Sequence, residues 1–273
     1  MLRCGAFSFS LDRPLIMGIV NLTPDSFSGD GLANDTERAI AHAHHQIAAG
    51  ADMLDLGAES SRPGAIPTSL EDELARLLPV LKALQGCGVP ISVDTYKPEV
   101  MRAALTAGAS MINDIYALRM PGALEAVAAS DCGVCLMHMQ GEPLTMQQAP
   151  VYADVVSDVH EFLTGRVREC LAAGVSADRL VLDPGFGFGK TLEHNLELLR
   201  RLDECGVEDL PLLAGMSRKT MLGAITGRAV ADRLSASVAA ALLAAQRGAH
   251  ILRVHDVSET RDALAVWRAL VSA

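Results

Sequence analysis

Nine polar or charged side chains follow short apolar runs along the chain, and several are of types that bind anions or exchange hydrogen bonds with a polar ligand. They are Asn21, Asp55, Asp94, Asn113, Asp114, His138, Asp183, Arg253 and His255. If the runs are parallel strands of one barrel, their carboxyl ends open on one face and these side chains converge there. Each residue alone could instead cap a helix or pair with a neighbour. Capping does not demand amides and long side chains at so many strand ends, so we predict a shared site.

Basic residues on the loops of the same face predict that the ligand carries an anion. The set comprises Arg62, Arg218, Lys219, Arg253 and His255. A guanidinium group matches phosphate or carboxylate with paired donors, and a short helix expected at 221–226 would present its amino terminus beside Lys219. Barrels often bind phosphate across their last two loops. Solvated surface charge is the alternative for Arg62 and Arg218.

Two loops are long and rich in glycine. Residues 21–31 are too rich in turn formers for a minimal connection, so we expect a mobile lid, with a simple helix start as the alternative. Residues 183–191 end like a P-loop, but Pro184 stands where that motif needs glycine. We expect a bend that brings backbone close to a ligand, with Phe186 and Phe188 as flat apolar faces unless one of them belongs to the core.

Three other features predict no site. Cys132 and Cys135 have metal-like spacing but lack a second ligand pair and run into a strand, which favours buried thiols. His42, His44 and His45 lack the H-E-x-x-H pattern and fit a solvated helix face. The chain has no G-x-S-x-G elbow, which disfavours acyl transfer.

A weak internal repeat predicts the elements that position these residues. A stretch with helical spacing, a glycine and a short apolar run recur, most clearly at Gly50, Gly108 and Gly248. About eight such units predict a (β/α)8 TIM barrel, and an open doubly wound sheet is the alternative. We expect one domain over residues 1–273, with a short N-terminal hairpin at 6–12 plugging the amino-terminal mouth of the barrel.

The composition limits the partners and the compartment. The 33 acidic residues outnumber the 23 basic ones, so the formal charge of −10 disfavours nucleic acid and anionic membranes as partners. Glycine and charge interrupt every apolar run, so no membrane helix is expected. Six scattered cysteines in a chain that is 50% hydrophobic fit reduced thiols, and we expect a cytoplasmic protein.

The loops taken together resemble those of dihydropteroate synthase from Gly18 to Asp256. The matching stretches are GIVNLTPDSFS, ESSRPGA, VDTYKP, INDI, MHMQGEP, LDPGFGFGK, GMSRKTMLG and RVHD. The resemblance implies a barrel that condenses 6-hydroxymethyl-7,8-dihydropterin diphosphate with para-aminobenzoate, releasing diphosphate and giving dihydropteroate in folate biosynthesis. It also implies Mg2+ as cofactor and a homodimer.

The same resemblance implies roles for individual residues, which divide into four groups. Asp94, Asn113, Asp183 and Lys219 would bind the pterin, with Asp94, Lys219 and Arg62 as the catalytic residues. Arg62, Arg253 and His255 would contact the diphosphate. Ser61, Pro63, Phe188 and Thr220 would line the aminobenzoate pocket, and Asn21 would hold or orient the metal.

Three positions depart from the family pattern. Ala58 replaces a usual glycine, Ser61 stands where threonine is common, and Tyr96 occupies a place often held by serine. Two other functions remain open: a pterin-dependent methyltransferase acting with a corrinoid partner, and a catalytically silent pterin-binding paralogue. The SRPG and SRK segments disfavour the first, and the retained diphosphate contacts disfavour the second.

Overall fold

A computed structural model of the chain describes residues 1–23, 36–60, 62 and 64–271. Eight parallel strands form a closed barrel in the order β10-β3-β4-β5-β6-β7-β8-β9. The barrel strands are β3 (Leu15–Asn21), β4 (Met53–Gly57), β5 (Ile91–Asp94), β6 (Met111–Asp114), β7 (Gly133–Met137), β8 (Leu180–Asp183), β9 (Leu212–Ala214) and β10 (Ala249–Val254). Because β10 pairs with β3, the predicted barrel is confirmed and the open sheet is wrong.

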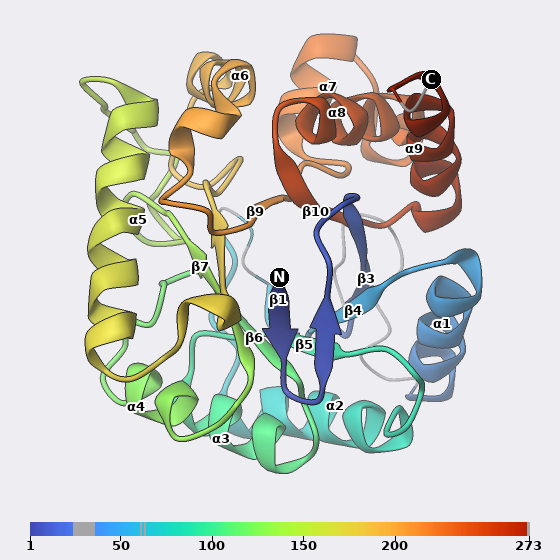
Figure 1. Cartoon of the computed structure of the whole chain (residues 1–273), viewed down its shortest axis with the longest axis vertical. Coiled ribbons are helices and arrows are strands. Elements are labelled where there is room, and N and C mark those ends of the chain that lie inside the picture. The colour runs from blue at the N-terminus through green and yellow to red at the C-terminus, as the bar shows by residue number, and fades with distance from the viewer. Residues whose placement is uncertain (24–35, 61, 63, 272–273) are drawn as a thin grey trace.

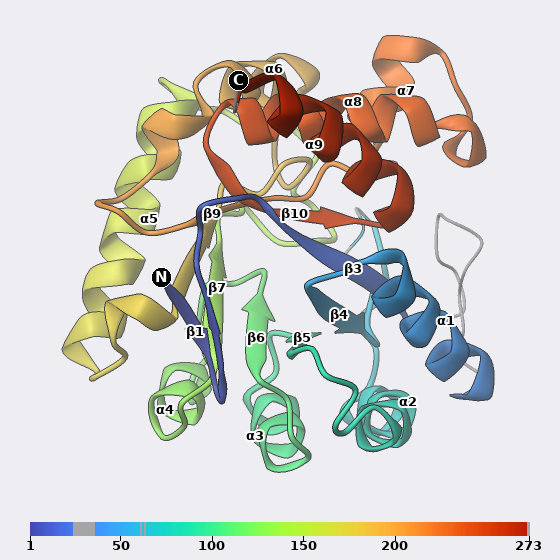
Figure 2. The same cartoon turned by 45° about the vertical axis from the view of Figure 1, so that its right-hand side comes forward.

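Helices surround the strands on the outside of the barrel (Figures 1 and 2). The α-helices are α1 (Thr36–Ala49), α2 (Leu70–Ala83), α3 (Pro98–Thr106), α4 (Ala123–Ala128), α5 (Val155–Ala172), α6 (Leu192–Arg200), α7 (Thr220–Thr226), α8 (Leu234–Gln246) and α9 (Val257–Val271). Short 3-10 helices lie at Ala177–Arg179, Leu202–Cys205 and Val230–Asp232. Helix α7 is the short extra helix expected at 221–226, so that prediction is confirmed.

Capping side chains fix where several of these helices begin. Ser69 accepts a hydrogen bond from the backbone N–H of Asp72 at the start of α2, and Asp154 does the same for α5. Thr191 and His194 form a capping box at α6. Each cap satisfies an N–H that the first helical turn leaves without a partner. These caps therefore set the lengths of the loops that carry polar side chains to the barrel mouth.

The barrel strands are apolar because both of their faces are buried. Their outward side chains pack against the helices in one large core. Inward side chains, including Met17, Met53 and Ile251, form a second cluster inside the barrel. This cluster fills the barrel interior on the amino-terminal side of the polar strand ends.

An antiparallel hairpin of β1 (Leu2–Cys4) and β2 (Phe7–Phe9) completes the inner cluster. Leu2 and Cys4 are fully buried against the inward residues of the barrel, so the hairpin packs on the amino-terminal side as predicted. The predicted span of 6–12 was wrong, because the turn lies at Gly5, whose φ of 58° suits glycine.

None of the helices in the described ranges combines the length and the apolar character needed to span a membrane. The lid expected at 21–31 falls outside the described residues from 24 onward.

Candidate active site

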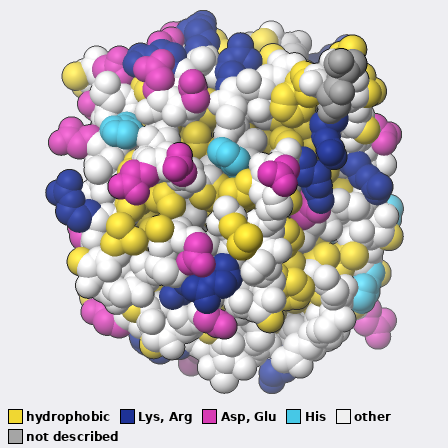
Figure 3. Space-filling model, viewed as in Figure 1, with side chains coloured by type: hydrophobic (Ala, Val, Ile, Leu, Met, Phe, Trp, Pro, Cys, Tyr) yellow, Lys and Arg dark blue, Asp and Glu magenta, His cyan; other side chains and the backbone are white. Residues whose placement is uncertain are grey.

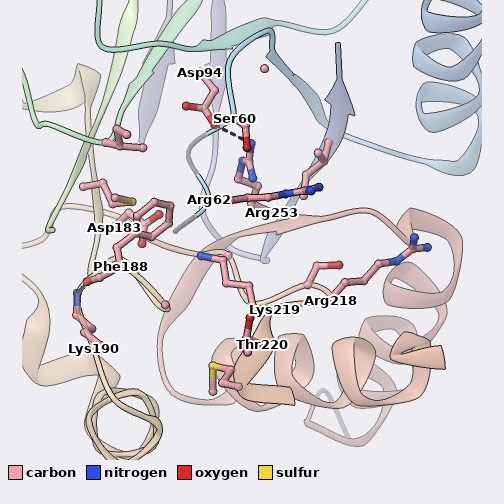
Figure 4. Close-up of a pocket in the computed structure, with 18 of the residues that line it drawn as sticks. Ser60, Arg62, Asp94, Asp183, Phe188, Lys190, Arg218, Lys219, Thr220 and Arg253 are labelled. Carbon is pink, nitrogen blue, oxygen red and sulfur yellow. Dashed lines mark hydrogen bonds and ion pairs between the residues drawn. The ribbon is translucent and has the colours of Figure 1, made fainter. Parts of the chain in front are cut away.

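A cavity of about 500 Å³ opens at the carboxyl ends of the barrel strands (Figure 4). Six of the nine predicted strand-end residues line it, namely Asn21, Asp94, Asn113, Asp183, Arg253 and His255. The loops add Arg62, Phe188, Lys219 and Thr220 from the predicted site. Ser61 and Pro63, the other two residues expected at the aminobenzoate pocket, lie outside the described residues.

Three strand-end residues were predicted to face the site and do not line the cavity. Asp114 is buried and accepts hydrogen bonds of 2.8 Å from the backbone N–H groups of Tyr116 and Leu118. The capping alternative is therefore the right one for Asp114. His138 lies against Lys190, with 3.0 Å between its Nδ1 and the lysine Nζ, and burial lowers its pKa to about 2. Asp55 lies fully buried among the residues that line the cavity.

Asp55 and Asp94 hold Arg253 between them. Nε of Arg253 donates to Oδ2 of Asp55 at 2.6 Å, and its Nη2 donates to Oδ2 of Asp94 at 3.0 Å. Asn113 also donates to Asp55, at 3.2 Å. A guanidinium group has five N–H donors, so about three remain for a ligand once these two bonds are made. Burial raises the pKa of Asp94 to about 7, an effect that the charge of Arg253 opposes.

Asp183 and Lys219 form a second charged region of the cavity. Lys219 points toward Asp183 and Phe188 in Figure 4. Its Nζ lies 4.5 Å from the centre of the Phe188 ring and donates to the carbonyl oxygen of Phe186. Burial lowers the pKa of Lys219 to about 8 and raises that of Asp183, while the charge of each opposes the shift of the other. These charged groups and the ring of Phe188 offer polar contacts and a flat apolar face to a planar ligand with polar edges.

Lys190 also lines the cavity, although no role for it was predicted. Its Nζ donates to the carbonyl oxygens of Gly185 at 2.9 Å and Phe188 at 3.0 Å, and it contacts His138. Burial lowers its pKa to about 7. This lysine ties the glycine-rich bend to the end of β7. The only signal in the sequence was its place after Gly189, in the motif that failed as a P-loop.

Two glycines of this bend, Gly185 and Gly189, approach protein backbone instead of the cavity, whereas Gly187 lines the cavity. A Cβ on Gly185 would lie 1.9 Å from the carbonyl oxygen of His138, and one on Gly189 would lie 2.4 Å from that of Gln140. Phe186 is fully buried and belongs to the core, whereas Phe188 lines the cavity. The bend therefore presses against the end of β7 and leaves one aromatic face to the site.

Gly185→Ala is expected to destabilise the protein by about 3 kcal/mol or more, because φ is 71° and the new Cβ would overlap His138. Gly174→Ala is the matched control: φ is 89°, yet nothing lies within 4 Å of its Cβ position. That variant should lose only about 1 kcal/mol, the cost of the backbone conformation alone. Urea unfolding measures both, and equal losses would contradict the overlap argument.

The remaining basic residues differ in what they offer a ligand. Arg218 donates to Oδ2 of Asp256 at 3.2 Å and turns away from Lys219 in Figure 4. His255 Nδ1 lies 3.0 Å from the hydroxyl of Ser217. Burial and the nearby Arg218 and Arg253 lower the pKa of His255 to about 3. His255 is therefore neutral at pH 7 and contributes hydrogen bonding instead of charge, whereas Arg62 lies beside Arg253 in the cavity (Figure 4).

Clustered metal ligands are lacking in the part of the barrel mouth that the structure describes. Within the described ranges, no group of three or more His, Cys, Asp or Glu residues is placed to hold a metal ion. Asn21 presents its amide in the cavity beside Gly57. Mg2+ is often held by one or two protein oxygens together with substrate phosphates. The residues present therefore fit a Mg2+ ion that arrives with a phosphorylated ligand.

The structure also shows where the cysteines and histidines lie for which no site was predicted. Cys132 and Cys135 are buried thiols, as predicted. His44 and His45 are exposed on α1, as expected for a solvated face, whereas His42 is half-buried and contacts Gln46.

Known proteins resemble this chain over nearly its full length. The model of the pterin binding enzyme family matches residues 17–255. Dihydropteroate synthase of Escherichia coli (strain K12) is 52% identical over 267 residues, which cover 97% of this chain and 95% of that protein. Dihydropteroate synthase of Neisseria meningitidis serogroup B is 52% identical over 275 residues, covering 98% and 96%.

Solved structures agree with this assignment. Burkholderia cenocepacia dihydropteroate synthase complexed with 7,8-dihydropteroate gives a TM-score of 0.92 at 51% identity, covering 99% of this chain and 96% of that one. Xanthomonas albilineans dihydropteroate synthase with 4-aminobenzoic acid gives 0.90 at 52% identity, covering 97% and 96%. The family model, the identities and the barrel with its polar mouth lead to one conclusion: this chain belongs to the dihydropteroate synthase family of pterin-binding enzymes.

Proposed function

We propose that this chain is a transferase that condenses 6-hydroxymethyl-7,8-dihydropterin diphosphate with para-aminobenzoate. The products are 7,8-dihydropteroate and diphosphate, in folate biosynthesis. The observation that carries the proposal is the division of the cavity into two charged regions. Asp183, Lys219 and Phe188 suit a flat heterocycle, and Arg62 with Arg253 suits a diphosphate. Relatives at about half identity have been solved with 7,8-dihydropteroate and with 4-aminobenzoic acid, which supports both substrates.

The pterin would lie between the Asp183 and Asn113 side chains and the ammonium group of Lys219. The carboxylate of Asp183 accepts hydrogen bonds from amino and ring N–H groups, and the amide of Asn113 both donates and accepts. Lys219 donates to the ring carbonyl from its position over Phe188. Asp94 lies at the neighbouring strand end and, when ionised, stabilises positive charge on the pterin.

The diphosphate would meet Arg62, the free N–H groups of Arg253, and His255 as a neutral donor. Mg2+ would arrive with the diphosphate, with the amide oxygen of Asn21 as a ligand or orienting group. When bound, the ion would neutralise charge on the leaving oxygens. The aminobenzoate would occupy the space near Phe188 and Thr220, and near Ser61 and Pro63 on the second loop.

The charges of these residues favour a mechanism through a pterin cation. The C–O bond to the diphosphate breaks, and the pterin ring delocalises the positive charge. The neutral aromatic amine attacks the exocyclic carbon, and the new C–N product then releases one N–H proton to water or to the departed diphosphate. Arg62 and Arg253 stabilise the departing oxygens, and Asp94 stabilises the cation. Exclusion of water from the cavity prevents hydrolysis of the cation. We propose no nucleophile from the protein.

The direct test mixes the purified protein with the dihydropterin diphosphate, para-aminobenzoate and Mg2+, and follows diphosphate release and dihydropteroate formation. Each component is omitted in turn. Product that requires all three supports the synthase. Pterin binding without product would favour the silent paralogue instead. The pterin-dependent methyltransferase gains no support from the relatives described above, which carry the synthase name.

The pH dependence should report the lysine at the pterin region. Lys219 must be protonated to donate to the pterin carbonyl, and its pKa in the free protein is about 8. The Lys219 ammonium group is present below about pH 8 and loses its proton as the pH rises through this pKa. We therefore expect kcat/KM for the pterin substrate to fall on the alkaline side of pH 8. A profile that stays flat to pH 10 would contradict a protonated Lys219 as the donor.

Arg62→Ala is expected to lower kcat about a hundredfold, because a charge-assisted contact to the leaving group is lost. Binding of 6-hydroxymethyl-7,8-dihydropterin, which lacks the diphosphate, should not change. Steady-state kinetics and calorimetry measure the two effects. Arg102→Ala, on the exposed face of α3, is the control. Unchanged kinetics in the Arg62 variant would leave Arg62 as surface charge.

We also propose that residues 1–273 form one pterin-binding domain, since all eight strands close a single barrel.

A homodimer is supported by large apolar side chains exposed on the last three helices. They include Ile225, Leu234, Leu243, Val266 and Leu270. Figure 3 shows hydrophobic side chains gathered over α8. Light scattering tests the dimer.

We propose a cytoplasmic location, because the six free thiols fit a reducing compartment.

A further inference from the structure

A largely buried polar cluster lies where the second loop leaves the barrel; one of its residues, Glu59, lines the cavity, and none of the roles above uses it. It consists of Glu59, Glu73, Thr95, Tyr96 and Lys97, and we name it the Lys97 cluster. Nζ of Lys97 donates to Oε2 of Glu73 at 2.6 Å and also to Oε2 of Glu59. The hydroxyl of Thr95 donates to Oε1 of Glu73 at 2.7 Å. The cluster thus joins residues from the loop after β4, from α2 and from the segment after β5.

Glu59 bridges the two ends of the loop that carries Arg62. Glu59 stands at the start of this loop, and its Oε1 accepts the backbone N–H of Thr68, at the end of the loop, at 2.8 Å. The same oxygen accepts the hydroxyl of Tyr96 at 3.0 Å. One carboxylate therefore ties residues 59 and 68 together and attaches both to the segment after β5. Arg62 lies on the stretch between them and lines the cavity.

The burial of the cluster means that these contacts determine where Glu59 can lie. The exposed fractions of the Glu59, Lys97 and Glu73 side chains are 7%, 17% and 1%. Removing one partner of such a pair leaves a buried charge unpaired, which costs more than the pair contributes. The contacts with Lys97, Tyr96 and Thr68 therefore favour the observed position of Glu59. Buried ion pairs often add little net stability, and in some proteins they fix one arrangement.

Tyr96 adds a contact that a serine at this position is too short to make. Its ring packs on Tyr116 with centroids 4.9 Å apart, and Nζ of Lys97 lies 4.8 Å from its centre. These contacts hold the ring so that its hydroxyl reaches Glu59. Tyr96 comes two residues after Asp94, so it links the Arg62 loop to the strand end that contacts Arg253.

We infer that Glu59 is a positioning residue, held by Lys97 and Tyr96, that sets Arg62 against the Asp94 end of the cavity. This inference rests on the proposed synthase reaction. It places the main effect at the diphosphate and aminobenzoate region, since three of the four proposed pterin residues, Asn113, Asp183 and Lys219, lie on β6, β8 and the segment before α7, and only Asp94 lies on β5. Loss of Glu59 should therefore slow turnover and weaken the use of aminobenzoate while leaving the pterin contacts in place.

The test compares Glu59→Ala and Tyr96→Phe with the wild type and with Glu71→Ala, an exposed glutamate on α2. Glu59→Ala should lower kcat/KM for aminobenzoate about thirtyfold to a hundredfold, as expected for a misplaced Arg62. Tyr96→Phe loses one hydrogen bond to a carboxylate and should lower it about threefold to tenfold. Affinity for 6-hydroxymethyl-7,8-dihydropterin should match the wild type in both, and Glu71→Ala should change nothing.

Hydrogen exchange over residues 60–68 provides a readout that does not depend on activity. Exchange should accelerate there in Glu59→Ala, and to a smaller extent in Tyr96→Phe. Wild-type values of kcat/KM and of exchange in a folded Glu59→Ala would overturn the inference. If Glu59→Ala does not fold, Tyr96→Phe decides by the same two measurements. If the wild type itself makes no product, the proposed reaction fails, and the exchange rates still decide whether Glu59 positions the loop.

Discussion

Lys219→Ala is expected to abolish measurable turnover, lowering kcat/KM for the pterin substrate about a thousandfold. The ammonium group lies over Phe188 and feels the negative charge of Asp183, so alanine removes the proposed donor to the pterin carbonyl and a cation that offsets the carboxylate. The fold should persist, because burial disfavours this charge and the side chain lies on a loop. Steady-state kinetics, calorimetry with the pterin and thermal unfolding measure the three effects.

Two further variants separate the donor from the charge. Lys219→Arg keeps the cation but cannot place a single ammonium over the ring, so it should recover only part of the activity. Lys82→Ala removes an exposed lysine of α2 and should behave as wild type. Wild-type rates in Lys219→Ala would refute the assignment of Lys219 to the pterin.

The sequence predicted the barrel because both of its signals are local. Each strand is a short apolar run, and a glycine precedes several of them, so length and spacing were enough. The position of the hairpin was missed because Leu2 and Cys4 show their burial only through contacts with residues distant in sequence, such as Ile251. Two apolar residues separated by one polar residue are too few to predict a strand by pattern.

The sequence predicted which strand ends carry the residues of the site, but it did not predict the hydrogen bonds between them. Asp55, Asp94 and Arg253 come from three strands, and no local pattern indicates that the two carboxylates share one guanidinium group. Asp114 and Asp183 are each the last residue of their strand. Only the structure shows that Asp114 caps the turn at Tyr116 while Asp183 faces the cavity.

Aspartates act on two of the cations of the cavity. Arg253 forms ion pairs with two aspartates, and the negative charge of Asp183 raises the pKa of Lys219 against the effect of burial. These carboxylates keep the side chains charged in a buried place, where an isolated cation would lose its proton or leave the site. An anionic ligand then meets donors that are already oriented. Arg62 approaches from a loop, which is why its placement depends on contacts such as those of Glu59.

Asp183→Asn is expected to lower pterin affinity about a hundredfold or more, because the amide offers one acceptor oxygen and an NH2 group where the ligand presents donors. A site built to accept hydrogen bonds rejects a mismatch strongly, since buried polar groups are left unpaired. The stability of the protein should be retained. The asparagine oxygen can still accept from the backbone N–H of Gly185, the contact that Asp183 makes at 2.7 Å.

Asp114→Asn provides the matched contrast, since Asp114 is also a buried carboxylate at a strand end. Its two oxygens each accept a backbone N–H, so asparagine should leave one donor unsatisfied and destabilise the protein by about 1 to 3 kcal/mol. The folded fraction should bind pterin with wild-type affinity, because Asp114 does not line the cavity. If Asp114→Asn lost affinity and Asp183→Asn kept it, the pterin region would lie elsewhere. If Asp183→Asn lost affinity and Asp114→Asn kept it, Asp183 would be the carboxylate that binds the ligand, and Asp114 would be the one that stabilises the local backbone.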